Sequence, residues 1–231
     1  QSTMRGSNID SLRNLEENLS LQGVDLTDFP HVLQFNKRDL GNLISVDDLD
    51  AELNHHSVPF FEAVATDGVG VQETLEGIVA RLLTEKKLTL AVAESCTGGL
   101  IASRLTDVPG SSDFLERGFV TYSNRAKMEL LGVPAAVLEK HGAVSEETAR
   151  LMSEGARQNA QTDLGLASTG IAGPTGGSKE KPVGSVYLAL ADAKNTICRH
   201  FAFRWDRRRN KLVFSEAALM LLHDYLSGTE K

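Results

Sequence analysis

The sequence predicts an α/β protein, a three-layer α/β/α sandwich with an added antiparallel pair of strands. Through most of the chain, apolar runs of strand length alternate with stretches of helical periodicity, as in parallel strands joined by crossover helices. Near the carboxyl end, two strand-like runs follow each other closely, which indicates antiparallel pairing. Several runs end in polar or glycine-rich segments, and ligand sites of such folds lie at the carboxyl ends of the strands.

The expected elements fall into two parts, residues 1–77 and residues 78–231. The first part contains strands at 31–35 and 58–63, helices at 46–53 and 71–85, and a helix-like apolar spacing at 11–19. The second contains strands at 88–94, 114–122, 163–168, 184–191 and 196–203, and helices at 99–107, 125–131, 145–160 and 206–226. The helix that begins at Val71 is expected to continue through Leu82 and Leu83, so that the two parts share a helix.

Composition narrows the function classes. The 231 residues carry a formal net charge of −7, which argues against a nucleic-acid surface spread over the whole molecule. Cys96 and Cys198 are too few for a disulfide scaffold, and no amino-terminal signal or membrane-spanning apolar run is visible. We therefore expect a cytoplasmic protein with no membrane partner. No group of His, Cys, Asp or Glu has the spacing of metal ligands, so we expect a reaction without metal or cofactor.

The segment TLAVAESCTGGL, residues 89–100, has the pattern of a buried strand that ends in a nucleophile. Ser95 and Cys96 lie side by side where the strand ends, and Gly98 and Gly99 lead into a helix-forming segment. A hydroxyl and a thiol are thus expected at the carboxyl edge of the sheet, near the amino end of a helix.

Two further segments strengthen this prediction. Residues 118–127, GFVTYSNRAK, read as a strand closing into a turn that brings a phenol, Tyr122, and an amine, Lys127, into one short window. Residues 170–178, GIAGPTGGS, hold four glycines and a proline, too many for the interior of a strand or helix. This last segment is expected to be a loop that faces a ligand.

Together with residues 139–148 (EKHGAVSEET), these three segments resemble the CinA C-terminal domain family, known as nicotinamide-nucleotide amidases. The resemblance extends from about residue 78 to residue 226, and the pairing of AESCTGG with GIAGPTGGS is specific. It implies the CinA C-terminal-like α/β/α sandwich fold. It also implies an enzyme that hydrolyses the carboxamide of nicotinamide mononucleotide, giving nicotinate mononucleotide and ammonia. The implied partner is this small-molecule substrate, and self-association into a homo-oligomer is also expected.

The resemblance assigns roles to individual residues. Ser95 is implied as the nucleophile, with Tyr122 and Lys127 as its polar partners. Arg207, in a run of arginines at a helix start, matches a family arginine and offers a cation for the substrate phosphate. The residues implied to bind the substrate are Thr97, Gly98, Gly99, Gly170, Ile171, Ala172, Gly173 and Arg207.

Hydrolysis of an amide by a serine requires a group that takes the hydroxyl proton. No histidine lies within these segments except His141, which precedes a helix and is more simply interpreted as a solvated loop residue. Lys127 and Tyr122 remain as candidate bases, and their spacing does not distinguish them. A lysine can act as a base only if its pKa is lowered toward neutrality, for example by desolvation.

Two neighbours of Ser95 leave alternatives open. Adjacent strand residues point to opposite faces, so only one of Ser95 and Cys96 is expected to face the site. The resemblance favours Ser95 and leaves Cys96 as a small buried residue, although a thiolate near a helix start is the better nucleophile.

Glu94 can either orient a polar group or cap the turn. Amides near Gly98 and Gly99, or in the loop at 170–178, are candidate oxyanion donors, and Ser145 is expected to cap a helix.

The amino-terminal part has a different resemblance. Its order of strand, NKRD, helix, strand, EAVATDG and helix resembles the carboxyl-terminal half of a Ras-like GTPase, most closely the MglA type. In that family the equivalents of Asn36 and Asp39 read guanine, Lys37 packs on the base, and the loop at Ala65 offers an amide to it. No GxxxxGK[ST] loop is present, so this partial Ras-like segment is expected neither to hydrolyse GTP nor to bind guanine nucleotide.

Three interpretations of residues 1–77 stay open: a truncated gene fusion, a degenerate module retained for binding, or an artefact of gene calling. Three functions follow for the chain. The first is a metal-independent amidase of pyridine-nucleotide salvage. The second is a non-catalytic, competence- or damage-associated binding protein of the CinA type, tethered by the GTPase remnant. The third is a pseudo-GTPase that senses guanine.

Overall fold

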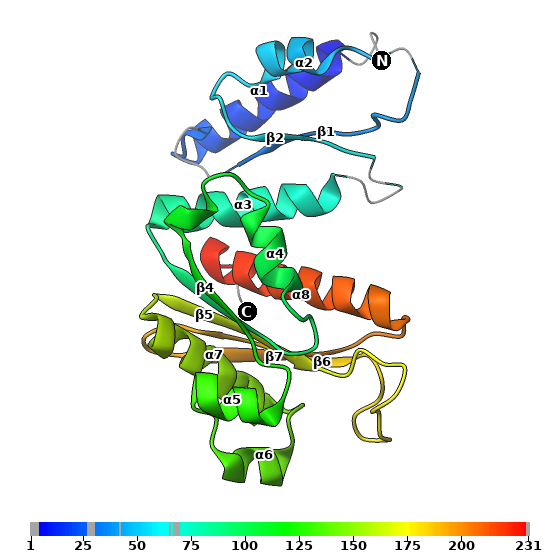
Figure 1. Cartoon of the computed structure of the whole chain (residues 1–231). Coiled ribbons are helices and arrows are strands. Elements are labelled where there is room, and N and C mark those ends of the chain that lie inside the picture. Colours follow the sequence, from blue (N-terminus) through cyan, green and yellow to red (C-terminus); the bar gives the residue numbers. More distant parts are fainter. Residues whose placement is uncertain (1–4, 27–30, 42, 65, 67–69, 230–231) are drawn as a thin grey trace. The chain divides into compact units, whose positions relative to one another are not determined.

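The computed structural model describes residues 5–26, 31–41, 43–64, 66 and 70–229. The chain divides into two compact units, Gln1–Arg81 and Leu82–Lys231. The division falls within helix α3 (Val71–Lys86), which continues without a break through Leu82 and Leu83 as the sequence predicts (Figure 1).

The first unit contains a small parallel sheet. Its elements before α3 are α1 (Arg5–Leu21), β1 (Leu33–Phe35), α2 (Val46–Leu53) and β2 (Phe60–Glu62). Strand β1 pairs with β2 in parallel. The second strand is shorter than the predicted 58–63, because the side chain of Asn54 hydrogen-bonds both the N–H and the carbonyl oxygen of Val58 and holds that residue in the preceding loop.

The second unit is built on a five-stranded mixed sheet, ordered β4-β3-β5-β6-β7. Its strands are β3 (Leu90–Glu94), β4 (Leu115–Val120), β5 (Leu164–Gly170), β6 (Ser185–Ala191) and β7 (Thr196–Ala202). Strand β3 pairs in parallel with β4 and β5, whereas β6 and β7 are antiparallel to their neighbours. This arrangement confirms the predicted sandwich with an added antiparallel pair.

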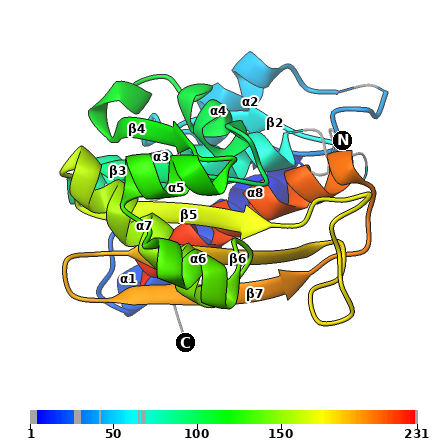
Figure 2. The ribbon, with the colours of Figure 1, turned by 60° about the horizontal axis from the view of Figure 1, so that its bottom comes forward.

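Helices cover both faces of this sheet. They are α4 (Leu100–Thr106), α5 (Asn124–Leu131), α6 (Ala135–His141), α7 (Glu146–Ala160) and α8 (Arg207–Ser227), with a short 3-10 turn at Ser111–Asp113. Helices α5, α6 and α7 lie on one face, and α4 and α8 lie on the other (Figures 1 and 2). Helix α6 was not predicted, although Pro134 before it and Gly142 after it are ordinary boundary signals.

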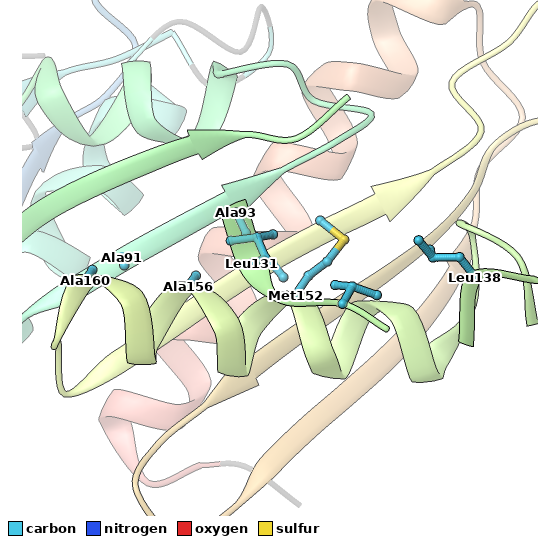
Figure 3. Close-up of a cluster of buried hydrophobic side chains, with 9 residues drawn as sticks. Ala91, Ala93, Leu131, Leu138, Met152, Ala156 and Ala160 are labelled. Carbon is cyan, nitrogen blue, oxygen red and sulfur yellow. The ribbon is translucent and has the colours of Figure 1, made fainter. Parts of the chain in front are cut away.

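Small residues bring α7 close to the sheet. The core on this face combines alanines of β3, β5 and α7 with larger side chains of α5, α6 and α7 (Figure 3). Its members are Ala91, Ala93, Leu131, Val133, Leu138, Met152, Ala156, Ala160 and Ala167. A Cβ on Gly155 of α7 would lie 2.0 Å from the carbonyl oxygen of Leu131, so only glycine allows α7 to approach the end of α5.

The sheet topology brings three carboxyl-terminal strand ends together. Because β3, β4 and β5 are parallel, the residues that follow them meet at one edge of the sheet. Two backbone hydrogen bonds extend the pairing beyond the strands, from Thr121 N to Glu94 O at 2.8 Å and from Ser95 N to Ser168 O at 2.9 Å. The end of β3 is therefore held on both sides, through Glu94 toward β4 and through Ser95 toward β5. Within the described residues, no helix is both long and apolar enough to span a bilayer.

Candidate active site

Ser95 and Lys127 meet at the end of β3. The amine Nζ of Lys127 lies 3.0 Å from Oγ of Ser95 and 2.7 Å from the carbonyl oxygen of Thr121. Ser95 is 9% exposed and Lys127 is 1% exposed, so the pair is almost completely shielded from solvent. Lys127 is one of the largest fully buried side chains of the chain's described part.

The start of α5 places Lys127. The Ser123 hydroxyl accepts a hydrogen bond from the amide of Ala126 and caps the helix, which fixes the first turn that carries Lys127. Burial lowers the pKa of Lys127 from 10.5 to about 8, because removing the amine from water disfavours its charged form. The neutral amine, which can accept a proton, is then a minor form near pH 7 but far more abundant than it is for an ordinary lysine.

Burial shifts the pKa of Cys96 in the opposite direction. Its thiol is buried, and burial raises the pKa of Cys96 from 9.0 to about 12. The thiol therefore stays protonated at neutral pH despite its place before a helix. This environment fits the interpretation of Cys96 as a small buried residue and not as the nucleophile.

Glu94 caps helix α4. Its carboxylate accepts hydrogen bonds from the amides of Gly99 at 3.0 Å, Ile101 at 3.1 Å and Ala102 at 2.9 Å, and the residue is 1% exposed. Of the two predicted roles, the cap is therefore the one observed. The amide of Gly99 is used here, so it is not available to an oxyanion.

The turn that follows Ser95 offers backbone donors. The Thr97 hydroxyl is fully buried and shares a hydrogen bond of 2.7 Å with Ser168, so its side chain is already paired. Among the described residues, the amides of Thr97 and Gly98 have no hydrogen-bond acceptor. Gly98 and Gly99 both have positive φ, 64° and 95°, a conformation that favours glycine.

Tyr122 lies at the glycine loop. It is 63% exposed, and its hydroxyl accepts a 3.0 Å hydrogen bond from Arg207. Arg207 also donates to the carbonyl oxygen of Gly173 at 2.7 Å. Within the described part of the chain, no hydrogen bond joins Tyr122 to Ser95 or Lys127. The three residues predicted as a catalytic group thus divide into a Ser95 and Lys127 pair and a separate Tyr122 and Arg207 pair.

The glycine loop is fixed where it leaves β5. A Cβ on Gly170 would lie 2.6 Å from the carbonyl oxygen of Ser185, and the amide of Ile171 donates to that same oxygen at 2.8 Å. The carbonyl oxygen of Ala172 accepts from the fully buried side chain of Asn210 at 3.0 Å. The predicted substrate loop is therefore anchored to both β6 and α8.

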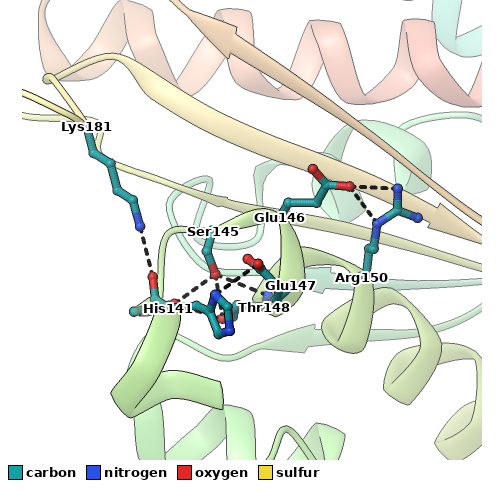
Figure 4. Close-up of polar contacts among 8 residues, drawn as sticks. His141, Ser145, Glu146, Glu147, Thr148, Arg150 and Lys181 are labelled. Carbon is teal, nitrogen blue, oxygen red and sulfur yellow. Dashed lines mark hydrogen bonds and ion pairs between the residues drawn. The ribbon is translucent and has the colours of Figure 1, made fainter.

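A polar cluster near the start of α7 anchors Lys181, three residues after this loop (Figure 4). Lys181 Nζ donates to the carbonyl oxygen of His141 at 2.9 Å, and the His141 ring lies 2.9 Å from the carboxylate of Glu147. Ser145 accepts from the amide of Thr148 and caps α7, as predicted. His141 thus contacts α7 and the loop, and it is not among the hydrogen-bond partners of Ser95.

Two residues near the loop and the turn were not singled out from the sequence. Asn210 bonds Ala172 and also both the amide and the carbonyl oxygen of Trp205, so it joins the start of α8 to the glycine loop. Lys211 Nζ lies 3.7 Å from the position that a Cβ on Gly98 would occupy. Both contacts join α8 to segments far away in the sequence, and no local pattern signals them.

The residues predicted as a guanine-reading remnant lie in the first unit. Asn36 and Lys37 line a groove there, and the Asn36 side chain accepts a hydrogen bond from the amide of Lys37 at 2.7 Å. Asp39 lies in the turn after β1, outside the lining of this groove, and Ala65 lies outside the described residues. Guanine reading by these residues stays a prediction.

Within the described residues, no three His, Cys, Asp or Glu side chains gather closely enough to hold a metal ion. The polar groups at Ser95 are a hydroxyl, a lysine amine and backbone amides. This set suits acyl transfer, since it provides an oxygen nucleophile, a base and hydrogen-bond donors.

A family model described as the CinA C-terminal domain matches residues 72–226. The chain belongs to this family. A CinA-like protein of Syntrophus aciditrophicus is 70% identical over 157 residues, covering 68% of this chain and 37% of that protein. A putative competence-damage inducible protein of Caldicellulosiruptor bescii is 56% identical over 151 residues, covering 65% of this chain and 37% of that protein. The chain therefore spans little more than a third of the length of these curated CinA relatives.

Solved CinA-family structures share the fold. The competence/damage inducible protein CihA from Agrobacterium tumefaciens matches with a TM-score of 0.66 and 42% identity, covering 68% of this chain and 96% of that one. A CinA superfamily protein from Klebsiella pneumoniae matches with a TM-score of 0.66 and 33% identity, covering 68% of this chain and 98% of that one. The family match begins within α3, and the Ras-like resemblance of the preceding residues stays a prediction.

Proposed function

We propose that the chain is a serine amidohydrolase that converts nicotinamide mononucleotide to nicotinate mononucleotide and ammonia. The observation that carries the proposal is the 3.0 Å contact between Lys127 Nζ and Ser95 Oγ in a buried site. A buried lysine whose pKa is lowered to about 8 is suited to take the proton of a serine hydroxyl. The substrate comes from the resemblance of the two glycine-rich segments and their neighbours to nicotinamide-nucleotide amidases.

The first half of the reaction forms an ester. Neutral Lys127 takes the proton from Ser95 Oγ as that oxygen attacks the carboxamide carbon. The C–N bond then breaks, and the Lys127 ammonium gives its proton to the departing nitrogen, which leaves as ammonia. The nicotinoyl group remains on Ser95 as an ester, and Lys127 is neutral again.

The second half releases the acid. Lys127 takes a proton from water as its oxygen attacks the ester carbon, and the C–O bond to Ser95 breaks. The ammonium of Lys127 returns the proton to Ser95 Oγ, and nicotinate mononucleotide leaves. Each oxyanion requires hydrogen-bond donors, and the unpaired amide of Thr97 follows Ser95 closely enough in the chain to provide one.

The test compares two single variants of the adjacent pair Ser95 and Cys96. Ser95→Ala is expected to lower kcat for ammonia release from nicotinamide mononucleotide by roughly 10³-fold or more, because the ester cannot form. Cys96→Ala is the matched control and should keep kcat within about threefold. Equal loss in both variants would contradict the assignment of the nucleophile. Absence of ammonia release from the wild-type protein would reject the amidase and leave the binding-protein alternative.

A further inference from the structure

Lys211 places an unpaired cation beside the turn that follows the nucleophile. This residue lies in the second turn of α8, and its Nζ lies 3.7 Å from a Cβ built on Gly98. Gly98 is exposed and Lys211 is half-buried. Within the described residues, Lys211 has no hydrogen bond or ion pair, although a partly desolvated ammonium is more stable with an anionic partner.

The neighbouring cation, Arg207, already donates to two groups of the protein. Arg207 lies one helical turn before Lys211, at i and i+4, so both side chains project from the same side of α8. The guanidinium of Arg207 binds the carbonyl oxygen of Gly173 and the hydroxyl of Tyr122. Of these two cations, Lys211 is therefore the one whose donors remain available to a ligand.

The backbone at Gly98 adds a second donor to the same place. The Gly98 amide has no acceptor among the described residues, and its positive φ of 64° presents this exposed turn without a side chain in the way. An ammonium and a free amide at a glycine turn are a suitable pair of donors for the oxygens of a phosphate. Gly98 lies three residues after Ser95, at most about 10 Å along the chain.

We propose that Lys211 and the Gly98 amide bind the phosphate of the substrate, while Ser95 attacks its carboxamide. The identity of the ligand as a mononucleotide rests on the proposed function. In this substrate a pyridine ring and a ribose separate the two groups, which suits a phosphate site at a short distance from the nucleophile. Lys211 is then a specificity-determining residue that distinguishes a nucleotide from its nucleoside.

The experiment measures kcat and KM for nicotinamide mononucleotide and for nicotinamide riboside, which has the same amide and no phosphate. Lys211→Gln should raise KM for the nucleotide roughly 10- to 100-fold, leave its kcat within about threefold, and leave kcat/KM for the riboside unchanged. Lys211→Arg, which keeps the cation, should restore most of the affinity. Arg208→Gln is the matched control, because it removes the same charge from an exposed position on the same helix.

A binding measurement separates this inference from the proposed function. In the Ser95→Ala protein, calorimetry should detect ribose 5-phosphate, and adding Lys211→Gln should weaken its binding at least tenfold, whereas adding Arg208→Gln should not. If this pattern holds but the wild type releases no ammonia, the phosphate site stands and the amidase is rejected. If the wild type is an amidase and Lys211→Gln affects nucleotide and riboside equally, or neither, the phosphate site is rejected.

Discussion

Lys127 donates to Ser95 from a fully buried position, with its Nζ 3.0 Å from the serine oxygen. Its other hydrogen-bond acceptor is a neutral carbonyl oxygen, that of Thr121, and not a carboxylate. The ammonium form therefore receives little compensation for lost hydration, which explains the direction in which its pKa moves. The following predictions depend on this environment.

The rate of hydrolysis should follow the ionisation of Lys127. Because the base must be neutral, kcat/KM for ammonia release should rise about tenfold per pH unit below pH 8 and level off above it. The measurement is a rate profile from pH 6 to 10, with circular dichroism at each pH to exclude unfolding. A profile that is flat from pH 6 to 9 would exclude Lys127 as the base.

Tyr122 should contribute much less to kcat than Lys127 does. The Tyr122 hydroxyl accepts from Arg207 and not from Lys127, so Tyr122→Phe should lower kcat less than tenfold. Lys127→Met should lower kcat roughly 10³-fold, because it removes the base. Comparable losses in the two variants would instead make the phenol a direct participant in proton transfer.

The burial of Lys127 should also make the free energy of unfolding depend on pH. Its pKa is lower in the folded chain, about 8, than the ordinary value of 10.5, so between these values the unfolded chain binds more protons. The free energy of unfolding of the wild type should then increase over this window, by about 3 kcal/mol relative to Lys127→Met.

Urea unfolding of both proteins at pH 7, 8, 9 and 10.5 measures this difference. Other titrating groups are common to the two proteins, so their contributions cancel to a first approximation. A difference in unfolding free energy that does not change with pH would mean that Lys127 has an ordinary pKa in the folded chain.

Glu94 should be required for both stability and the shape of the glycine turn. Glu94→Gln keeps the size of the side chain but weakens three hydrogen bonds to amides at the start of α4, so it should lower the free energy of unfolding by about 2 kcal/mol. Glu116→Gln, at an exposed position of β4, is the control and should change it by less than about 0.5 kcal/mol. Equal unfolding midpoints for the two variants would exclude the capping role.

Local patterns were sufficient to predict the strands, most helices and the position of Ser95. The run of residues 89–94 and the glycines after it predict a buried strand that ends at Ser95, and Ser145 is predicted as a helix cap because its partner lies only three residues away. These signals depend on spacing along the chain. They do not require knowledge of which distant segments meet.

The remaining features depend on distant contacts. The contact of Lys211 with Gly98 spans more than a hundred residues, and Asn210 joins α8 to the glycine loop over 38 residues. The burial of Lys127, which lowers its pKa, depends on tertiary packing around α5, which contacts α7, and not on its neighbours in sequence. The hydrogen bond between Arg207 and Tyr122 likewise joins residues that are 85 positions apart in the sequence.

The anchoring of the glycine loop at both ends has a practical consequence. Asn210 and Arg207 hold its first residues, and Lys181, three residues after it, is held against α6. Within the described residues, the exposed tip between these anchors, residues 175–180, has no hydrogen bond to Ser95 or Lys127. A fluorophore attached at position 179 is therefore expected to leave the hydrogen bonds of Ser95 and Lys127 intact, which makes this tip a suitable place to label the domain for biosensor experiments.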